Sequence, residues 1–190
     1  MNLPNKLTVL RLVLTVFFVA SLSVTFPLHS TVALVLFLLA SLTDYLDGEI
    51  ARRWQLITDF GKLMDPLADK ILTAAAFICL VAPPYEAMPA WAVIVIVSRE
   101  FLITGLRLLA SSKGIILPAE KLGKHKTAWQ MITILFFLAC LAIRDFWEPG
   151  QIWQAAWTWG GATLVTVTVI LTFYSGLTYL WKNRQLLVTS

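Results

Sequence analysis

Long runs of apolar residues, separated by short polar segments, dominate this chain of 190 residues. Six of the runs predict helices, and they cover residues 7–25, 31–54, 59–81, 90–112, 127–143 and 153–181. A helix needs about 17–25 mostly apolar residues to cross the hydrocarbon core of a bilayer. The sequence shows neither a domain linker nor an internal repeat. We therefore expect one domain over residues 1–190, an all-α integral membrane protein with six transmembrane helices.

Basic residues are concentrated in the connections on one side of the predicted membrane. They occur in residues 6–11, 52–62, 113–126 and 182–184, whereas the opposite connections contribute Arg144 alone. The positive-inside rule therefore predicts that both termini face the cytoplasm. The net charge of +4 is explained by topology and by anionic lipid headgroups, and it does not indicate a nucleic-acid partner.

Four aspartates interrupt the apolar pattern near the end of the second predicted helix and the start of the third. Asp44 and Asp47 are three residues apart, and Asp65 and Asp69 are four apart, so each pair shares one helix face. If the chain turns back between the helices, the four acids converge, and like charges in a medium of low dielectric then require cations. Ligands that are all oxygen favour Mg²⁺ or Mn²⁺ over zinc. We therefore predict a site for divalent ions.

The residues beside these acids favour a diphosphate ligand. Gly48, Ala51 and Gly61 remove side-chain bulk on the same helix faces, which leaves room for a ligand to approach the backbone. Arg52 lies about one turn beyond Gly48 and is suited to bidentate contacts with phosphate oxygens. Metal ligands, small residues and an arginine together predict a diphosphate site.

The same segment resembles a known family. The residues D-Y-L-D-G-E-I-A-R from Asp44 to Arg52, followed by G-K-L-M-D-P-L-A-D from Gly61 to Asp69, are similar to the signature of the CDP-alcohol phosphatidyltransferases in every defining position. The resemblance implies a six-helix membrane fold, usually dimeric, that moves a phosphatidyl group from a CDP-linked lipid to an alcohol and releases CMP. It also implies two metal ions held by the four aspartates, Asp69 as the base, and Gly48, Arg52 and Gly61 as contacts of the CDP moiety.

A second element of the resemblance lies at the N-terminus. Asn5, Thr8 and Arg11 recur in the spacing P-N-x-x-T-x-x-R, which is also familiar from these enzymes and implies that Asn5 and Thr8 line the nucleotide side of the site. Two other interpretations stay open at this point. Asn5 is also suited to cap a helix, and Arg11 is also suited to fix the topology.

The acceptor alcohol is indicated by charges in the fourth and fifth predicted helices. Arg99, Glu100 and Arg107 interrupt an apolar run, where charges are costly unless they are paired or functional, and Glu100 is suited to neutralise one arginine. Lys124 and Lys126 add cations at the entry to the fifth helix. We interpret Arg99, Arg107, Lys124 and Lys126 as contacts for a phosphate on the acceptor.

The segments S-R-E-F-L-I-T-G-L-R and G-K-H-K-T are similar to those of bacterial phosphatidylglycerophosphate synthases. This similarity implies that the substrates are CDP-diacylglycerol and sn-glycerol 3-phosphate. It also implies a homodimer that lies in the bacterial inner membrane and contacts membrane lipids. His125 departs from the apolar residue usual at its position, and we expect it to be an exposed loop residue.

Other functions remain as alternatives. The same chemistry is possible with inositol phosphate, serine or phosphatidylglycerol as the acceptor. An Asp-rich intramembrane prenyltransferase also holds a diphosphate through Mg²⁺, but it leaves the G-x-x-A-R element unexplained. A cation transporter leaves Arg52 and the arginines of the fourth helix without a role.

Overall fold

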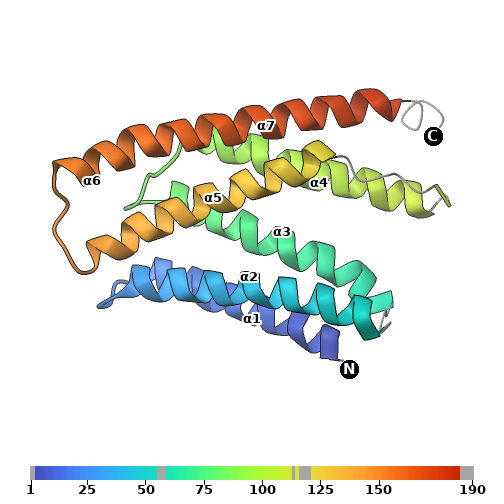
Figure 1. The fold of residues 1–190 in the computed structure, drawn as a ribbon, viewed down its shortest axis with the longest axis horizontal. Coiled ribbons are helices and arrows are strands. Elements are labelled where there is room, and N and C mark those ends of the chain that lie inside the picture. Colours follow the sequence, from blue (N-terminus) through green and yellow to red (C-terminus); the bar gives the residue numbers. More distant parts are fainter. Residues whose placement is uncertain (1–2, 55–58, 113, 116–120, 185–190) are drawn as a thin grey trace.

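The computed structural model describes the backbone of residues 3–54, 59–112, 114–115 and 121–184, and the side chains of residues 5–44, 64, 67–112, 114–115 and 125–184. Within these residues the regular structure is helical, and the helices form six rods (Figure 1). The first five rods are α1 (Leu3–Ser23), α2 (His29–Trp54), α3 (Asp59–Val81), α4 (Ala90–Ser112) and α5 (Lys121–Arg144). The sixth is continuous through α6 (Gln151–Ala155), the π-helical segment η1 (Ala156–Gly160) and α7 (Gly161–Lys182).

The six predicted helices are confirmed, with differences at their ends. The second, third and fourth helices end as predicted, at Trp54, Val81 and Ser112. The fifth helix begins at Lys121, so residues 121–126 are helical rather than part of a basic loop. The predicted start at residue 127 is wrong because it was inferred from polarity, and Lys and His are compatible with a helical turn.

The rods run alternately in opposite directions (Figure 1). α1 packs against α2 and α3, α5 packs against both α2 and α7, and α4 packs against α7. The start of α1, the junction of α2 with α3, the start of α5 and the end of α7 all lie toward one end of the bundle (Figure 1). We call this the charged end, because the charged residues Asp44, Asp69, Arg107 and Lys126 lie toward it, and we call the opposite end the apolar end.

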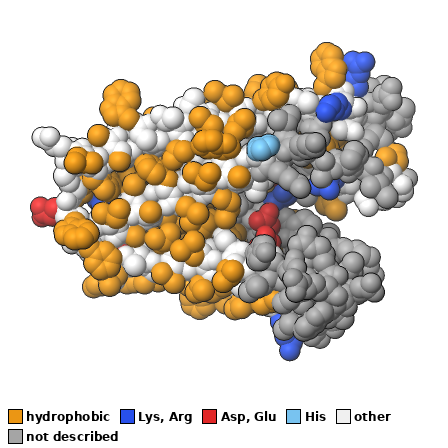
Figure 2. Space-filling view, viewed as in Figure 1, with side chains coloured by type: hydrophobic (Ala, Val, Ile, Leu, Met, Phe, Trp, Pro, Cys, Tyr) orange, Lys and Arg blue, Asp and Glu red, His pale blue; other side chains and the backbone are white. Residues whose placement is uncertain are grey.

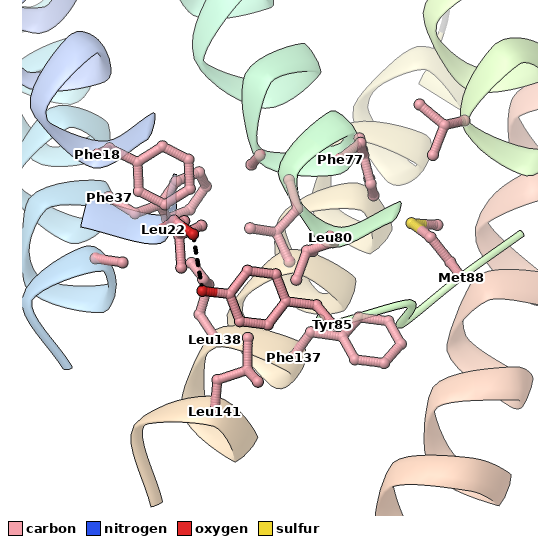
Figure 3. Packing of buried hydrophobic residues seen from close by; sticks show 14 of the residues in the cluster. Phe18, Leu22, Phe37, Phe77, Leu80, Tyr85, Met88, Phe137, Leu138 and Leu141 are labelled. Carbon is pink, nitrogen blue, oxygen red and sulfur yellow. Dashed lines mark hydrogen bonds between the residues drawn. The ribbon is translucent and has the colours of Figure 1, made fainter. Parts of the chain in front are cut away.

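The apolar end contains the main hydrophobic core (Figure 3). Phe18 of α1 and Phe37 of α2 are fully buried, with ring centroids 5.7 Å apart. Tyr85, in the connection between α3 and α4, donates a hydrogen bond of 2.9 Å to the carbonyl oxygen of Leu22. This bond satisfies one of the carbonyls that the last turn of a helix leaves without an intrahelical partner. The connections at this end therefore fix the relative positions of α1 and α3.

A carboxylate links two further elements at the same end. Asp145, just beyond α5, accepts hydrogen bonds from the backbone amide and from the hydroxyl of Thr31, at 2.7 and 2.8 Å. Thr31 lies in the first turn of α2, where backbone amides lack intrahelical partners. The contact therefore ties the end of α5 to the start of α2.

The outer surface is that of a membrane protein. Large apolar side chains point outward along the rods, including Phe17, Ile78, Ile94 and Ile170, which are all more than half exposed. Figure 2 shows hydrophobic side chains over the middle of the bundle and charged side chains mainly toward its two ends. Among the described residues, α1, α5 and the rod from Gln151 to Lys182 are long and apolar enough to cross a membrane by composition. The six-helix membrane fold agrees with this surface.

Candidate active site

Two of the four predicted metal ligands have described side chains, Asp44 on α2 and Asp69 on α3. The carboxylate of Asp69 interacts electrostatically with that of Asp44. Helices α2 and α3 thus bring these two acids into one region at the charged end, although 24 residues separate them in the chain. The other predicted residues of this segment lie outside the part whose side chains are described, and their roles stay predictions: Asp47, Gly48, Arg52, Gly61 and Asp65.

Asp44 is held by an arginine from the first helix. Its Oδ1 atom lies 2.8 Å from Nη1 of Arg11, whose side chain is completely buried while that of Asp44 is 46% exposed. Thr15 donates a hydrogen bond to the carbonyl oxygen of Arg11, one turn away. An ion pair with a fully buried cation fixes the direction of the half-exposed Asp44 carboxylate. Arg11 therefore has a structural partner in the site, which goes beyond a role in topology.

Asn5 and Thr8 are buried on the face of α1 that carries Arg11. Because α1 begins at Leu3, Asn5 lies inside the first turn of the helix and does not precede it as a cap. The structure thus places the P-N-x-x-T-x-x-R residues on the inner face of α1 beside the first acid. Their contact with a nucleotide stays a prediction.

A cavity of about 460 Å³ opens among α3, α4, α5 and α7. Its lining includes charged side chains from three helices, namely Asp69, Lys70, Arg99, Glu100, Arg107 and Lys126. Three of the four predicted contacts for an acceptor phosphate therefore share one cavity with the predicted base. The fourth, Lys124, has a side chain outside the described residues.

Glu100 is the centre of an ion-pair network in this cavity. Its Oε2 accepts a hydrogen bond of 3.1 Å from Nζ of Lys70, and its Oε1 accepts bonds from Nη1 of Arg99, at 3.3 Å, and from Nζ of Lys126. Nε2 of Gln130 donates to the same Oε1 at 3.4 Å. A glutamate whose side chain is only 11% exposed needs such partners, because burial of a carboxylate without them is very costly.

The sequence indicated only part of this network. Glu100 was expected to neutralise one arginine, and it does pair with Arg99, but it also binds two lysines from other helices. Lys70 was not among the predicted site residues. Its position directly after Asp69, inside the apolar part of α3, is a signal that was available, since charges in such a segment are costly unless they are paired.

Polar side chains continue from this network along α5 and α7. Gln130 donates to the hydroxyl of Thr172 at 3.4 Å, and the hydroxyls of Thr133 and Thr168 are 2.8 Å apart. Thr168 also donates to the carbonyl oxygen of Trp129 at 3.3 Å. Hydrogen bonds between membrane helices are a recognised source of helix association. They fix the wall of the cavity that α5 and α7 form.

His125 does not line this cavity. Its side chain is exposed, as predicted, although it lies within the first turns of α5 rather than in a loop.

The comparisons with known proteins agree with the motif and with the fold. The model of the CDP-alcohol phosphatidyltransferase family matches residues 1–174, which include every site residue discussed above. The chain belongs to the CDP-alcohol phosphatidyltransferase family. Enzymes of this family are embedded in the membrane and generally depend on a divalent metal.

Several curated relatives within the family share one name, CDP-diacylglycerol–glycerol-3-phosphate 3-phosphatidyltransferase. The protein of this name from Bacillus subtilis (strain 168) is 38% identical over an alignment of 209 residues, which covers 100% of this chain and 98% of the relative. The one from Salmonella paratyphi A is 34% identical over 188 residues, with coverage of 96% and 95%. The one from Mycoplasma pneumoniae is 43% identical over 152 residues, with coverage of 70% and 66%.

The described acids suit the metal that this family uses. Asp44 and Asp69 offer hard carboxylate oxygens from two helices, the donor type that Mg²⁺ and Mn²⁺ prefer. The Asp44 carboxylate is about half exposed, and the buried side chain of Arg11 orients it through a contact with Oδ1. The donor chemistry of the described residues therefore fits a divalent ion.

Proposed function

We infer that this protein transfers the phosphatidyl group of CDP-diacylglycerol to sn-glycerol 3-phosphate, with phosphatidylglycerophosphate and CMP as products. The names of the relatives that match 96–100% of the chain support this reaction. The observation that carries the assignment is the arrangement of one cavity. It has a carboxylate, Asp69, on α3 and the cations Arg99, Arg107 and Lys126 on α4 and α5. An acceptor with a hydroxyl at one end and a phosphate at the other matches that arrangement.

In the proposed mechanism, Asp69 acts as the general base. It takes the proton of the acceptor hydroxyl, whose oxygen then attacks the phosphorus atom of the phosphatidyl group. A new phosphorus–oxygen bond forms as the bond to the CMP oxygen breaks, and CMP leaves with the electron pair. The electrostatic interactions of Asp69 with Asp44 and Arg11 support a base close to Asp44, one of the proposed metal ligands.

We propose that two divalent ions, Mg²⁺ or Mn²⁺, bind to Asp44, Asp47, Asp65 and Asp69. When bound, such ions neutralise the charge of a diphosphate and of the leaving CMP. Arg11 keeps the Asp44 carboxylate in place through its buried guanidinium. Asn5, Thr8, Gly48, Arg52 and Gly61 are the proposed contacts of the CDP moiety.

The acceptor phosphate is proposed to bind to Arg99, Arg107, Lys124 and Lys126. Glu100 neutralises part of this cation cluster in the described structure through its bonds to Arg99 and Lys126. A phosphate dianion that enters the cavity adds negative charge beside these cations, which favours binding. The cluster therefore selects acceptors that carry a phosphate over neutral alcohols.

The distribution of basic residues indicates how the enzyme is oriented in its membrane. We propose a multi-pass protein of the bacterial inner membrane with both termini and the cavity facing the cytoplasm, because the basic connections lie toward the charged end. The nucleotide of the donor lipid then meets the site from the aqueous side. A homodimer is the proposed assembly.

The acceptor is tested with purified protein, Mg²⁺ and CDP-diacylglycerol. Parallel reactions receive sn-glycerol 3-phosphate, inositol phosphate, serine or phosphatidylglycerol, and both CMP and the lipid product are measured. We expect CMP and phosphatidylglycerophosphate to form together with sn-glycerol 3-phosphate and not with the other alcohols. Turnover with another acceptor, but not with this one, excludes the proposed substrate. If no acceptor releases CMP, the phosphatidyltransferase assignment itself fails.

A further inference from the structure

Arg99 borders two separate spaces in the bundle. It lines the cavity of about 460 Å³, and it also lines an apolar groove of about 240 Å³ between α4 and α7. Its side chain is only 12% exposed, and its Nη1 reaches Glu100 at 3.3 Å. The aliphatic part of Arg99 therefore passes along α7 before the guanidinium reaches the charged cavity.

Gly176 of α7 is the residue that makes room for this side chain. It is buried in the interior of α7, where glycine is intrinsically unfavourable for a helix. A Cβ atom at this position would lie 2.9 Å from Cγ of Arg99, 3.7 Å from Nε and 3.9 Å from Cδ. The closest atom, Cγ, lies near the backbone of α4, so movement of the guanidinium alone does not relieve the clash. The whole side chain has to turn to another rotamer.

We propose that Gly176 is a positioning residue for the acceptor phosphate. Because it has no side chain, it lets the Arg99 stem cross α7 and sets the guanidinium in the cavity beside Glu100. This inference rests on the proposed role of Arg99 in acceptor binding, and it adds a residue of α7 that does not itself touch the substrate.

Two other glycines provide matched controls. A Cβ at Gly161, also on α7, would lie 2.8 Å from the Phe137 ring in the hydrophobic core. A Cβ at Gly105, on the same helix as Arg99, would meet no atom within 4 Å. The three substitutions to alanine therefore add the same methyl group against an arginine stem, against a core ring, or into open space.

The test uses the full-length enzyme in detergent with CDP-diacylglycerol and Mg²⁺. The variants are Gly176→Ala, Gly161→Ala, Gly105→Ala, Arg99→Ala and the double variant Arg99→Ala/Gly176→Ala. For each one, kcat, KM for sn-glycerol 3-phosphate, KM for CDP-diacylglycerol and Tm are measured. A displaced charge-assisted hydrogen bond predicts that Gly176→Ala raises the acceptor KM about tenfold and leaves the donor KM unchanged.

The control variants are expected to separate this effect from helix packing. Gly105→Ala keeps kcat and both KM values, and its Tm is unchanged or slightly higher because alanine favours a helix more than glycine does. Gly161→Ala lowers Tm without a change in the acceptor KM. The double variant has the acceptor KM of Arg99→Ala alone, because a truncated side chain no longer meets the added methyl group. Such non-additivity is the signature of two residues that act through one contact.

The outcomes distinguish the two hypotheses. If Arg99→Ala raises the acceptor KM but Gly176→Ala does not, the role of Gly176 is overturned and the acceptor site stands. If Arg99→Ala leaves the acceptor KM unchanged, the proposed acceptor site loses Arg99, and the inference about Gly176 fails with it.

A folding defect has its own readout. If Gly176→Ala yields no folded enzyme, the double variant Arg99→Ala/Gly176→Ala shows whether the clash with Arg99 is the cause. Recovery of folded protein with the KM of Arg99→Ala supports a clash with the Arg99 stem, whereas a double variant that is equally unfolded overturns the proposal.

Discussion

The two ends of the bundle are built in different ways. At the apolar end, Phe18, Phe37 and Phe137 are fully buried and fill the space between α1, α2 and α5. At the charged end, α3, α4, α5 and α7 surround a cavity of about 460 Å³. Its lining includes the Glu100 carboxylate and several cations. The comparison shows that close packing holds the helices at one end, while the other end keeps an open cavity, in which we propose that the acceptor binds.

The charged end is held together by ion pairs in addition to a small apolar cluster, Ile103, Leu106 and Tyr179, in which α4 packs on α7. Glu100 joins Lys70 of α3, Arg99 of α4 and Lys126 of α5. Ion pairs of this kind depend on which charges are present, whereas packing depends on volume. Substitutions at the two ends should therefore affect different measurements.

The largest effect is expected at Asp69. The Asp69→Asn variant lacks the proposed base, so kcat should fall by about 10²–10⁴-fold. Tm should be largely kept, because the side chain lines the cavity and lies outside the hydrophobic core. Binding of CDP-diacylglycerol with metal should also be largely kept, because three of the four proposed acidic ligands remain and the amide oxygen of Asn is still a donor for a hard cation. Steady-state turnover and donor binding measured on the same preparation check both parts. A variant with normal turnover would exclude Asp69 as the base.

A packing defect should give the opposite result. Phe18→Ala removes a fully buried ring that packs on Phe37, and it should cost about 3–5 kcal/mol of unfolding free energy. The folded fraction should keep its KM values, because the cavity is at the other end. Unfolding in detergent and acceptor kinetics measure the two parts.

Its matched control is the neighbouring residue on α1. Phe17 is 59% exposed, so Phe17→Ala should change Tm little. Equal destabilisation by both substitutions would contradict the assignment of the core to one face of α1.

Glu100→Gln should weaken the charged end itself. The substitution keeps the shape of the side chain but removes the counter-charge of Lys70, Arg99 and Lys126, at a cost of about 1–3 kcal/mol. Added inorganic phosphate should raise the Tm of this variant more than that of the original protein, because the anion replaces the missing charge.

The control for this variant is Glu86→Gln, at an exposed position in the connection between α3 and α4. It should leave both Tm and the phosphate effect unchanged. If Glu100→Gln, like Glu86→Gln, changes neither Tm nor the phosphate effect, the Glu100 carboxylate does not stabilise the cavity.

The smallest effect is expected at Arg107, whose side chain lines the cavity from an exposed position on α4. Arg107→Ala should raise KM for sn-glycerol 3-phosphate about tenfold or less, since solvent weakens a charge contact at an exposed site. His125→Ala, at an exposed position on α5 outside the cavity, serves as the control and should keep this KM. An unchanged KM in Arg107→Ala would remove this arginine from the phosphate site.

Much of the fold follows from local patterns in the sequence. The apolar runs predicted six helices, because hydrophobic length is a property of each segment alone. The misplaced start of α5 has the same origin, since residues 121–126 are polar but helical. Polarity reports contact with water or headgroups, and it does not report backbone conformation.

The sequence predicted only those features of the candidate site that depend on spacing within one helix. Helical spacing indicated that Asp65 and Asp69 share a face, and the charges of α4 and α5 indicated a phosphate. The sequence did not indicate that Arg11 pairs with Asp44, or that Lys70 binds Glu100. These contacts join different helices, and the order of residues along one helix carries no information about the rotation of its neighbour.

The sequence by itself determined the membrane-spanning helices, the acidic motif and the family, because each depends on residue type and spacing within short segments. Only the tertiary structure decided which charges meet, where the cavity lies, and that Gly176 of α7 lies against the stem of Arg99. The physical reason is that pairing and steric exclusion act over a few ångströms in space. The fold alone sets those distances between residues that are far apart in the chain.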